Sequence, residues 1–107
     1  MTIGSFIREW RAYFRFRRLP PNEKTIVFYA EDFSNWTYFE TIIKELTGSL
    51  GKNICYVTSS KDDQVLKFDE ENIQAFCIGS GTVRTAFFST LEADVMVMTM
   101  PDLHFVE

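Results

Sequence analysis

A short glycine-containing loop provides residue types that suit the binding of a phosphate group. It comprises Gly79, Ser80, Gly81 and Thr82, and Arg84 follows it. Glycines let the backbone approach an anion closely, and the N-terminus of a following helix offers free N–H groups. An arginine can add two parallel hydrogen bonds to phosphate. The spacing matches neither the dinucleotide-binding fingerprint nor a P-loop, so an ordinary strand-to-helix turn with positive φ is the alternative.

Polar residues also follow two apolar runs of the sequence. Glu31 and Asp32 come after the first run, whereas Thr99, Asp102 and His104 come after the last. An acidic pair in such a place can hold Mg²⁺ or cap the next helix. We take all five as candidate residues of a ligand cleft. Because the chain has one histidine, a His-rich zinc site is excluded, and we predict neither a metal site nor a cofactor.

The first 18 residues combine apolar and basic side chains at helical spacing. One arc of the expected helix carries Ile3, Ile7, Trp10 and Phe14. A neighbouring stripe carries Arg8, Arg11, Arg15 and Arg18. Pro20 should end the helix at Leu19, because the residue before a proline avoids the helical conformation. Two roles stay open: the helix packs its apolar arc on the domain, or it lies on an anionic membrane surface. The residues expected at that membrane surface are Arg8, Trp10, Arg11, Phe14 and Arg15.

Charge is distributed unevenly along the chain. Residues 1–18 contain five arginines and one glutamate, a net charge of +4, whereas residues 19–107 contain six basic and fourteen acidic residues, a net charge of −8. A nucleic-acid-binding domain would be basic over its working face, so we predict no nucleic-acid partner. A short basic segment on an acidic body instead suits a phosphate-bearing ligand or an anionic membrane.

Size and composition favour one folded domain. The chain has 107 residues, of which 46% are hydrophobic and 16% aromatic, so it is not a disordered chain. Two cysteines exclude a disulfide scaffold, and both Cys55 and Cys77 lie in apolar runs typical of buried positions. No apolar run approaches the roughly 20 residues of a membrane span. We therefore expect a cytoplasmic protein, at the inner face of the cell membrane if its first helix binds lipid.

Four apolar runs alternate with helical patterns after the first helix. The predicted strands lie near residues 25–30, 53–58, 73–78 and 94–100. Helical spacing covers residues 36–50 and 82–91. This alternation predicts an α/β fold: a three-layer Rossmann-like half with a four-stranded parallel sheet, preceded by an N-terminal amphipathic helix. We expect residues 1–21 to form the helix and a proline linker, and residues 22–107 to form the α/β domain.

The order of the strands can also be predicted from the apolar runs. The first run is apolar on both faces, which is typical of a central strand in a parallel sheet. We therefore expect the order 2-1-3-4, with the first strand between the second and the third.

Several segments resemble the N-terminal part of bacterial CDP-glycerol glycerophosphotransferase-like proteins. The resemblance covers roughly residues 22–103 and is most specific in the run ADVMVMTMPDL. The matching segments are residues 25–31, Tyr38, Phe39, Leu46, residues 56–59 and residues 93–103. The resemblance implies two Rossmann-like halves that face each other across a cleft, with the acceptor on the N-terminal half and the CDP-activated donor on the other. It also implies functional roles for the loop at residues 79–81 and for Thr99, Pro101, Asp102 and His104.

Two functions follow as expectations. The first is an acceptor-side domain of a glycerophosphotransferase- or glycosyltransferase-like protein of cell-envelope polymer synthesis. These 107 residues contain no donor-binding half, so we expect no transfer by this chain alone and a need for a donor-binding domain or partner protein. The second is a non-catalytic α/β module that binds another protein. Catalytic residues cannot be assigned from the sequence.

Overall fold

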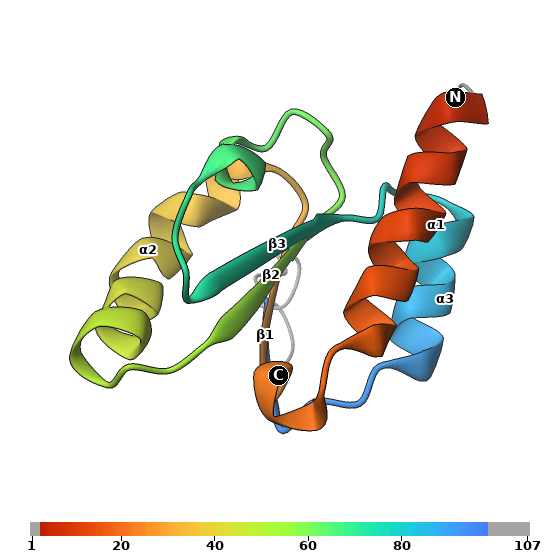
Figure 1. The fold of residues 1–107 in the computed structure, drawn as a ribbon. Helices are drawn as coiled ribbons and strands as arrows, with labels where there is room; N and C mark the ends of the chain where they lie inside the picture. Colours follow the sequence, from red (N-terminus) through yellow and green to blue (C-terminus); the bar gives the residue numbers. More distant parts are fainter. Residues whose placement is uncertain (1–2, 99–107) are drawn as a thin grey trace, which may run out of the picture.

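The computed structural model describes residues 3–98, in which a four-stranded parallel sheet is covered by helices on both faces (Figure 1). The strands are β1 (Ile26–Ala30), β2 (Ile54–Thr58), β3 (Ile73–Cys77) and β4 (Val95–Met98). Each begins within one residue of its predicted start. The α/β, Rossmann-like fold class is therefore confirmed, including the N-terminal helix.

The strand order is β3-β2-β1-β4, so the predicted order 2-1-3-4 is wrong. β1 is an inner strand as expected, but its neighbours are β2 and β4, and β3 pairs with β2 at the edge of the sheet. Gln74 in β3 fits this edge position, since its side chain donates to the Glu23 carboxylate at 3.2 Å. This is the strand order of one half of a doubly wound sheet. The chain first runs outward from β1 through β2 to β3, and then crosses back to place β4 on the other side of β1.

The described residues also form three α-helices and four short helical turns; α1 and η1 precede β1, and the others connect the strands. The α-helices are α1 (Ile3–Arg18), α2 (Trp36–Lys44) and α3 (Thr82–Thr90). The short elements are η1 (Pro21–Glu23), η2 (Phe33–Asn35), η3 (Glu45–Ser49) and η4 (Gln64–Lys67). α1 ends just before Leu19 and Pro20, as the sequence predicts. No helix within residues 3–98 is both long and apolar enough to cross a membrane.

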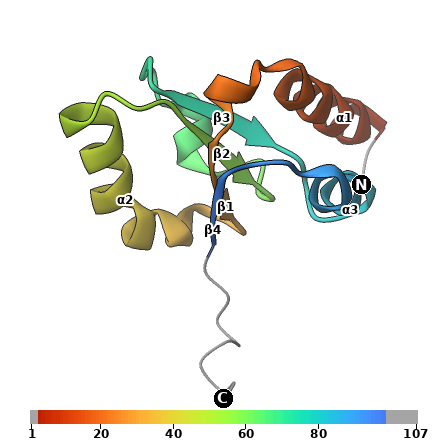
Figure 2. The ribbon, with the colours of Figure 1, turned by 90° about the horizontal axis from the view of Figure 1, so that it is seen from below.

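Alternate residues of the strands face two separate cores. On one face, Val27 and Tyr29 of β1 pack with α1 and α3; on the other, Phe28 and Ala30 pack with α2 and η4. Figure 2 shows α2 on one side of the sheet and α1 with α3 on the opposite side. This arrangement explains why β1 is apolar at nearly every position. Crossovers of the same hand that run in opposite directions along a sheet place their helices on opposite faces, and this is the arrangement observed here.

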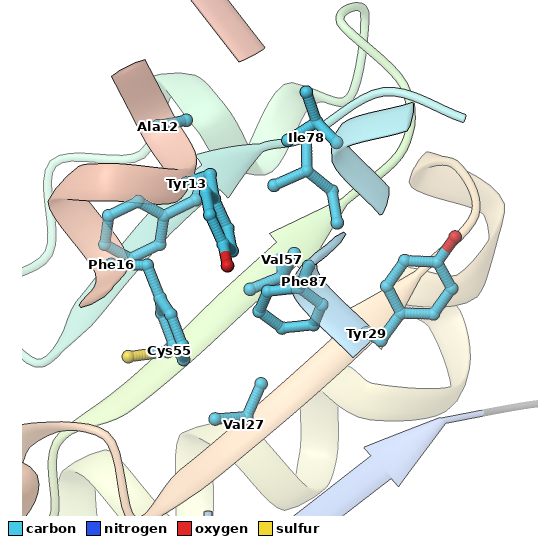
Figure 3. Packing of buried hydrophobic residues seen from close by; sticks show 11 residues of the cluster. Ala12, Tyr13, Phe16, Val27, Tyr29, Cys55, Val57, Ile78 and Phe87 are labelled. Atoms are coloured by element: carbon cyan, nitrogen blue, oxygen red, sulfur yellow. The ribbon is translucent and has the colours of Figure 1, made fainter. Parts of the chain in front are cut away.

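α1 packs on the sheet through a different face from the predicted apolar arc. Its buried residues are Ala12, Tyr13 and Phe16, which lie over β3 and beside α3 (Figure 3). The Phe16 ring contacts the rings of Phe76 and Phe87, with centroids 5.7 Å and 5.2 Å apart. The small side chain of Ala12 allows the helix to approach the sheet. Of the arc that the sequence offered for this contact, Trp10 is partly buried against the core, whereas Ile3, Ile7 and Phe14 are exposed.

Candidate functional site

A pocket of about 720 Å³ lies at the carboxyl ends of β2 and β3, beside α1. Its walls come from α1, from the segment after β2 and from β3 with the loop that follows it. The lining residues are Ser5, Arg8, Glu9, Arg11, Ala12, Arg15, Ser59, Lys61, Leu66, Ala75, Cys77, Gly79 and Ser80. Ligands of open parallel sheets bind outside the carboxyl ends of the strands, at the point where the strand order reverses. The pocket shares that edge of the sheet but lies beside β3, away from the reversal between β1 and β4.

The pocket is strongly basic. Four cationic side chains line it, from Arg8, Arg11, Arg15 and Lys61, against the single carboxylate of Glu9. Arg15 lies over the Phe76 ring, with its guanidinium carbon 5.0 Å from the ring centroid. All four basic residues, Arg15 included, are exposed to solvent at the rim of the pocket. Such a group of fixed positive charges attracts an anion, and arginine in particular binds phosphate through two N–H groups at once.

Glu9 and Gly79 are in close contact on one wall of the pocket. Gly79 has a φ of 72°, and a Cβ atom at this position would lie 2.2 Å from a carboxylate oxygen of Glu9. The other oxygen, Oε1, is buried and has no hydrogen-bond partner among the described residues. A buried acceptor without a donor costs free energy, so a donor from a ligand would be favourable here. The positive φ that the sequence predicts for this loop is thus present, and it leaves room for a carboxylate.

Cys77 is half-buried and lines the same pocket. Burial is the main cause that raises the pKa of its thiol, and the nearby charge of Glu9 adds to the increase. The backbone N–H of Gly79 acts in the opposite direction. The thiol is therefore protonated near neutral pH and is a poor nucleophile.

Arg84 lies outside this pocket and points to the end of β1. Its Nη1 donates to the Tyr29 hydroxyl at 3.4 Å, and this contact raises the pKa of Arg84. The Tyr29 hydroxyl also hydrogen-bonds to Ser59, which lines the pocket. Arg84 therefore supports the pocket wall through two hydroxyl groups and does not reach the Gly79–Ser80 backbone that the sequence assigns to it.

The predicted phosphate-binding loop is divided between two places. Gly79 and Ser80 line the pocket, whereas Gly81 and Thr82 begin α3 and are absent from the lining. Gly81 is the residue before the helix and provides no side-chain cap. The structure therefore brings half of the predicted loop together with the arginines of α1.

The predicted cleft residues at the end of β1 lie apart from the pocket. Asp32 caps the helical turn η2, because its side chain accepts from the Ser34 backbone N–H at 2.9 Å. The hydrogen bonds from the Ser34 hydroxyl and from the Ser34 backbone N–H lower the pKa of Asp32. Glu31 is exposed beside it. The other predicted cleft residues, Thr99, Asp102 and His104, lie outside the described residues, as does Pro101.

The segment between β2 and β3 is held by a buried carboxylate. Asp63 is 1% exposed and accepts hydrogen bonds from the Tyr56 hydroxyl at 2.9 Å and from the Val65 backbone N–H at 3.0 Å. Burial and the charge of Asp63 raise the pKa of Tyr56. This contact fixes the segment that carries Ser59 and Lys61 to the pocket.

Comparisons with known proteins add no further assignment. No family model, curated protein or solved structure matches the chain. Within residues 3–98, no group of three or more histidine, cysteine or acidic side chains is placed to hold a metal ion.

Several polar residues of the pocket, among them Glu9, Ser59 and Lys61, were not assigned to a site from the sequence. Ser59 and Lys61 follow β2 at the carboxyl edge of the sheet, and Glu9 joins them only through the packing of α1 on β3. The one usable hint was that Glu9 is the single acidic residue among the five arginines of the first 18 residues.

Proposed function

We propose that this chain is the acceptor-side domain of a glycerophosphotransferase- or glycosyltransferase-like protein, and that its basic pocket binds the phosphate of a polyol phosphate. The observation that carries the proposal is the group of four cationic side chains at the carboxyl edge of the sheet, beside Gly79 and Ser80. Three arginines and a lysine exceed what one phosphate dianion needs, so the pocket can neutralise a phosphate ester and hold it in one orientation.

Glu9 supports a ligand that carries hydroxyl groups as well as a phosphate. A carboxylate would repel a lone phosphate ion, but it accepts hydrogen bonds from hydroxyl groups, and its Oε1 lacks a donor. A glycerol phosphate would place its phosphate among the arginines and a hydroxyl near Glu9. The resemblance to CDP-glycerol glycerophosphotransferases supports the same chemical class. Transfer would need a donor-binding half, which the resemblance places in a second domain.

Calorimetric titration with glycerol 3-phosphate, inorganic phosphate and glycerol tests this proposal. We expect glycerol 3-phosphate to bind more tightly than phosphate, and glycerol not to bind. Arg11→Gln should weaken the binding of glycerol 3-phosphate roughly fivefold, or about 1 kcal/mol, because Arg11 sits at the exposed rim. Arg18→Gln is the matched control, since Arg18 is exposed on the same helix but does not line the pocket.

The Glu9→Gln variant tests recognition of the hydroxyl groups separately from recognition of the phosphate. The variant removes the negative charge, so we expect inorganic phosphate to bind more tightly and the preference for glycerol 3-phosphate to shrink. The proposal is wrong if glycerol 3-phosphate does not bind at millimolar concentration, or if Arg18→Gln weakens it as much as Arg11→Gln does. Failure of all three ligands would favour the alternative of a non-catalytic module that binds a protein.

A further inference from the structure

α1 has a second apolar face, which the fold leaves exposed. The helix uses Ala12, Tyr13 and Phe16 to pack on the domain, and these are 4% to 6% exposed. The neighbouring side of the helix carries large apolar residues at spacings of three and four; of these, Trp10 is partly buried against the core. This outer face of α1 consists of Ile3, Phe6, Ile7, Trp10 and Phe14.

The outer face is already ordered as a cluster. The Trp10 ring stacks on the Phe14 ring, with centroids 5.7 Å apart, and meets the Phe6 ring edge-on at 6.0 Å. Ile3, Ile7 and Phe14 are 79%, 47% and 49% exposed. The hydrogen bond between Tyr13 and Thr90, at 2.7 Å, helps to fix the other side of the helix to α3. Figure 1 shows α1 at the margin of the domain, beside α3, so its outer side is directed away from the sheet.

The charges around the outer face are all positive. On a helical wheel, Arg11 and Arg18 border it on one side, and Arg17 lies within it, between Phe6 and Trp10. Glu9, the one carboxylate of α1, is directed to Gly79 and the pocket. Within residues 3–98 the structure contains one salt bridge, Lys44–Glu40, so no arginine of α1 is paired with a carboxylate there.

We propose that the outer face of α1 binds an anionic membrane surface. Tryptophan and phenylalanine are suited to the boundary between headgroups and acyl chains, and the bordering arginines are placed to meet lipid phosphates. The rest of the chain, residues 19–107, has a net charge of −8 and is repelled by such a surface. The protein therefore docks through α1 alone, with the acidic body directed away. This inference does not depend on the pocket binding a phosphate ester.

Vesicle co-sedimentation of the full chain tests the inference. We expect binding to vesicles of phosphatidylglycerol and phosphatidylcholine, and much weaker binding to phosphatidylcholine alone. Binding should fall more than tenfold at about 1 M salt, where the Debye length is about 3 Å. Because Trp36 is already buried, a blue shift of tryptophan emission on binding would report the entry of Trp10 into the bilayer.

Variants of exposed residues distinguish vesicle binding by the outer face of α1 from binding by exposed apolar residues elsewhere on the protein. Ile7→Gln and Phe14→Gln together should weaken vesicle binding at least tenfold while the titration with glycerol 3-phosphate is unchanged. Ile42→Gln is the matched control, since Ile42 on α2 is 47% exposed, as Ile7 is. Arg18→Gln should weaken binding roughly fivefold. Circular dichroism should show that all three variants remain folded.

Three results would overturn the inference. The first is the absence of vesicle binding at low salt by the wild-type chain. The second is an equal loss of binding in Ile42→Gln and in the Ile7→Gln and Phe14→Gln double variant. The third is a dimer in sedimentation velocity that this double variant dissociates, which would assign the outer face to a second copy of the chain.

Discussion

Replacement of Tyr56 by phenylalanine should destabilise the fold through the carboxylate of Asp63. Tyr56 is fully buried, and its hydroxyl donates to Oδ2 of Asp63 at 2.9 Å. The substitution removes one oxygen and leaves the ring packed against Trp36, whose centroid is 6.0 Å away. Asp63 keeps the hydrogen bond from the Val65 N–H to its other oxygen. One oxygen of a buried carboxylate is therefore left without a donor.

The cost follows from the loss of that donor. Hydrogen bonds to charged groups contribute about 1.5–3 kcal/mol, and we expect about 2 kcal/mol for Tyr56→Phe. In a domain of this size, that loss lowers the melting temperature by roughly 10 °C. Asp63→Asn should cost less, because an amide oxygen can still accept from Val65 and no buried charge remains.

Urea unfolding followed by tryptophan fluorescence measures this difference. Burial and Asp63 raise the pKa of Tyr56 in the folded state, so its neutral form is favoured by folding. That contribution is fully present below about pH 10, the ordinary tyrosine pKa, and is lost as the pH rises above it. The difference in the free energy of unfolding between the wild type and Tyr56→Phe should therefore become smaller above pH 10. A Tyr56→Phe variant within 0.5 kcal/mol of the wild type at pH 7, as an approximate limit, would refute the reasoning.

Three further predictions concern the site and its supports. Cys77 should react slowly with iodoacetamide at pH 7 and faster as the pH rises toward its raised pKa, and glycerol 3-phosphate should protect it from the reagent. Cys55 should stay unmodified in the native protein, because burial raises the pKa of its thiol to about 12. Asp32→Ala should cost about 1 kcal/mol of helix capping at pH 7 in thermal melts. Because hydrogen bonds lower the pKa of Asp32, its charge stabilises the fold above about pH 4, so the cost should shrink as the pH falls below that value. Gly79→Ala should cost about 1–2 kcal/mol of stability for the positive φ and, by displacing Glu9, should also abolish the preference for glycerol 3-phosphate over phosphate in calorimetry.

The strand and helix positions could be predicted because their signals are local. β1 and β2 are buried on both faces and so appear as unbroken apolar runs, and Pro20 limits α1 by its own geometry. Strand order is not local. The apolar runs of β3 and β4 are both short, and either one suits the position beside β1. The sequence of each run therefore does not determine which of the two pairs with β1. Gln74, a polar residue within β3, was the available hint that β3 is an edge strand.

The site was predicted in part for the same reason. The positive φ at Gly79 follows from the glycine in a strand-to-helix turn, whereas the direction of Arg84 depends on Tyr29, 55 residues away. Helical spacing identified the arginine stripe of α1. It could not identify which face of α1 packs on the sheet, because that choice is made by Phe16 fitting between Phe76 and Phe87.

An amide chemical-shift map of the full chain, titrated with glycerol 3-phosphate, tests whether the basic pocket binds the phosphate ester. We expect the largest shifts at Ser59, Gly79 and Ser80 and along the first half of α1, with α2 unaffected. Shifts confined to Thr82 and Arg84 at the start of α3, or no shifts at millimolar ligand, would contradict it.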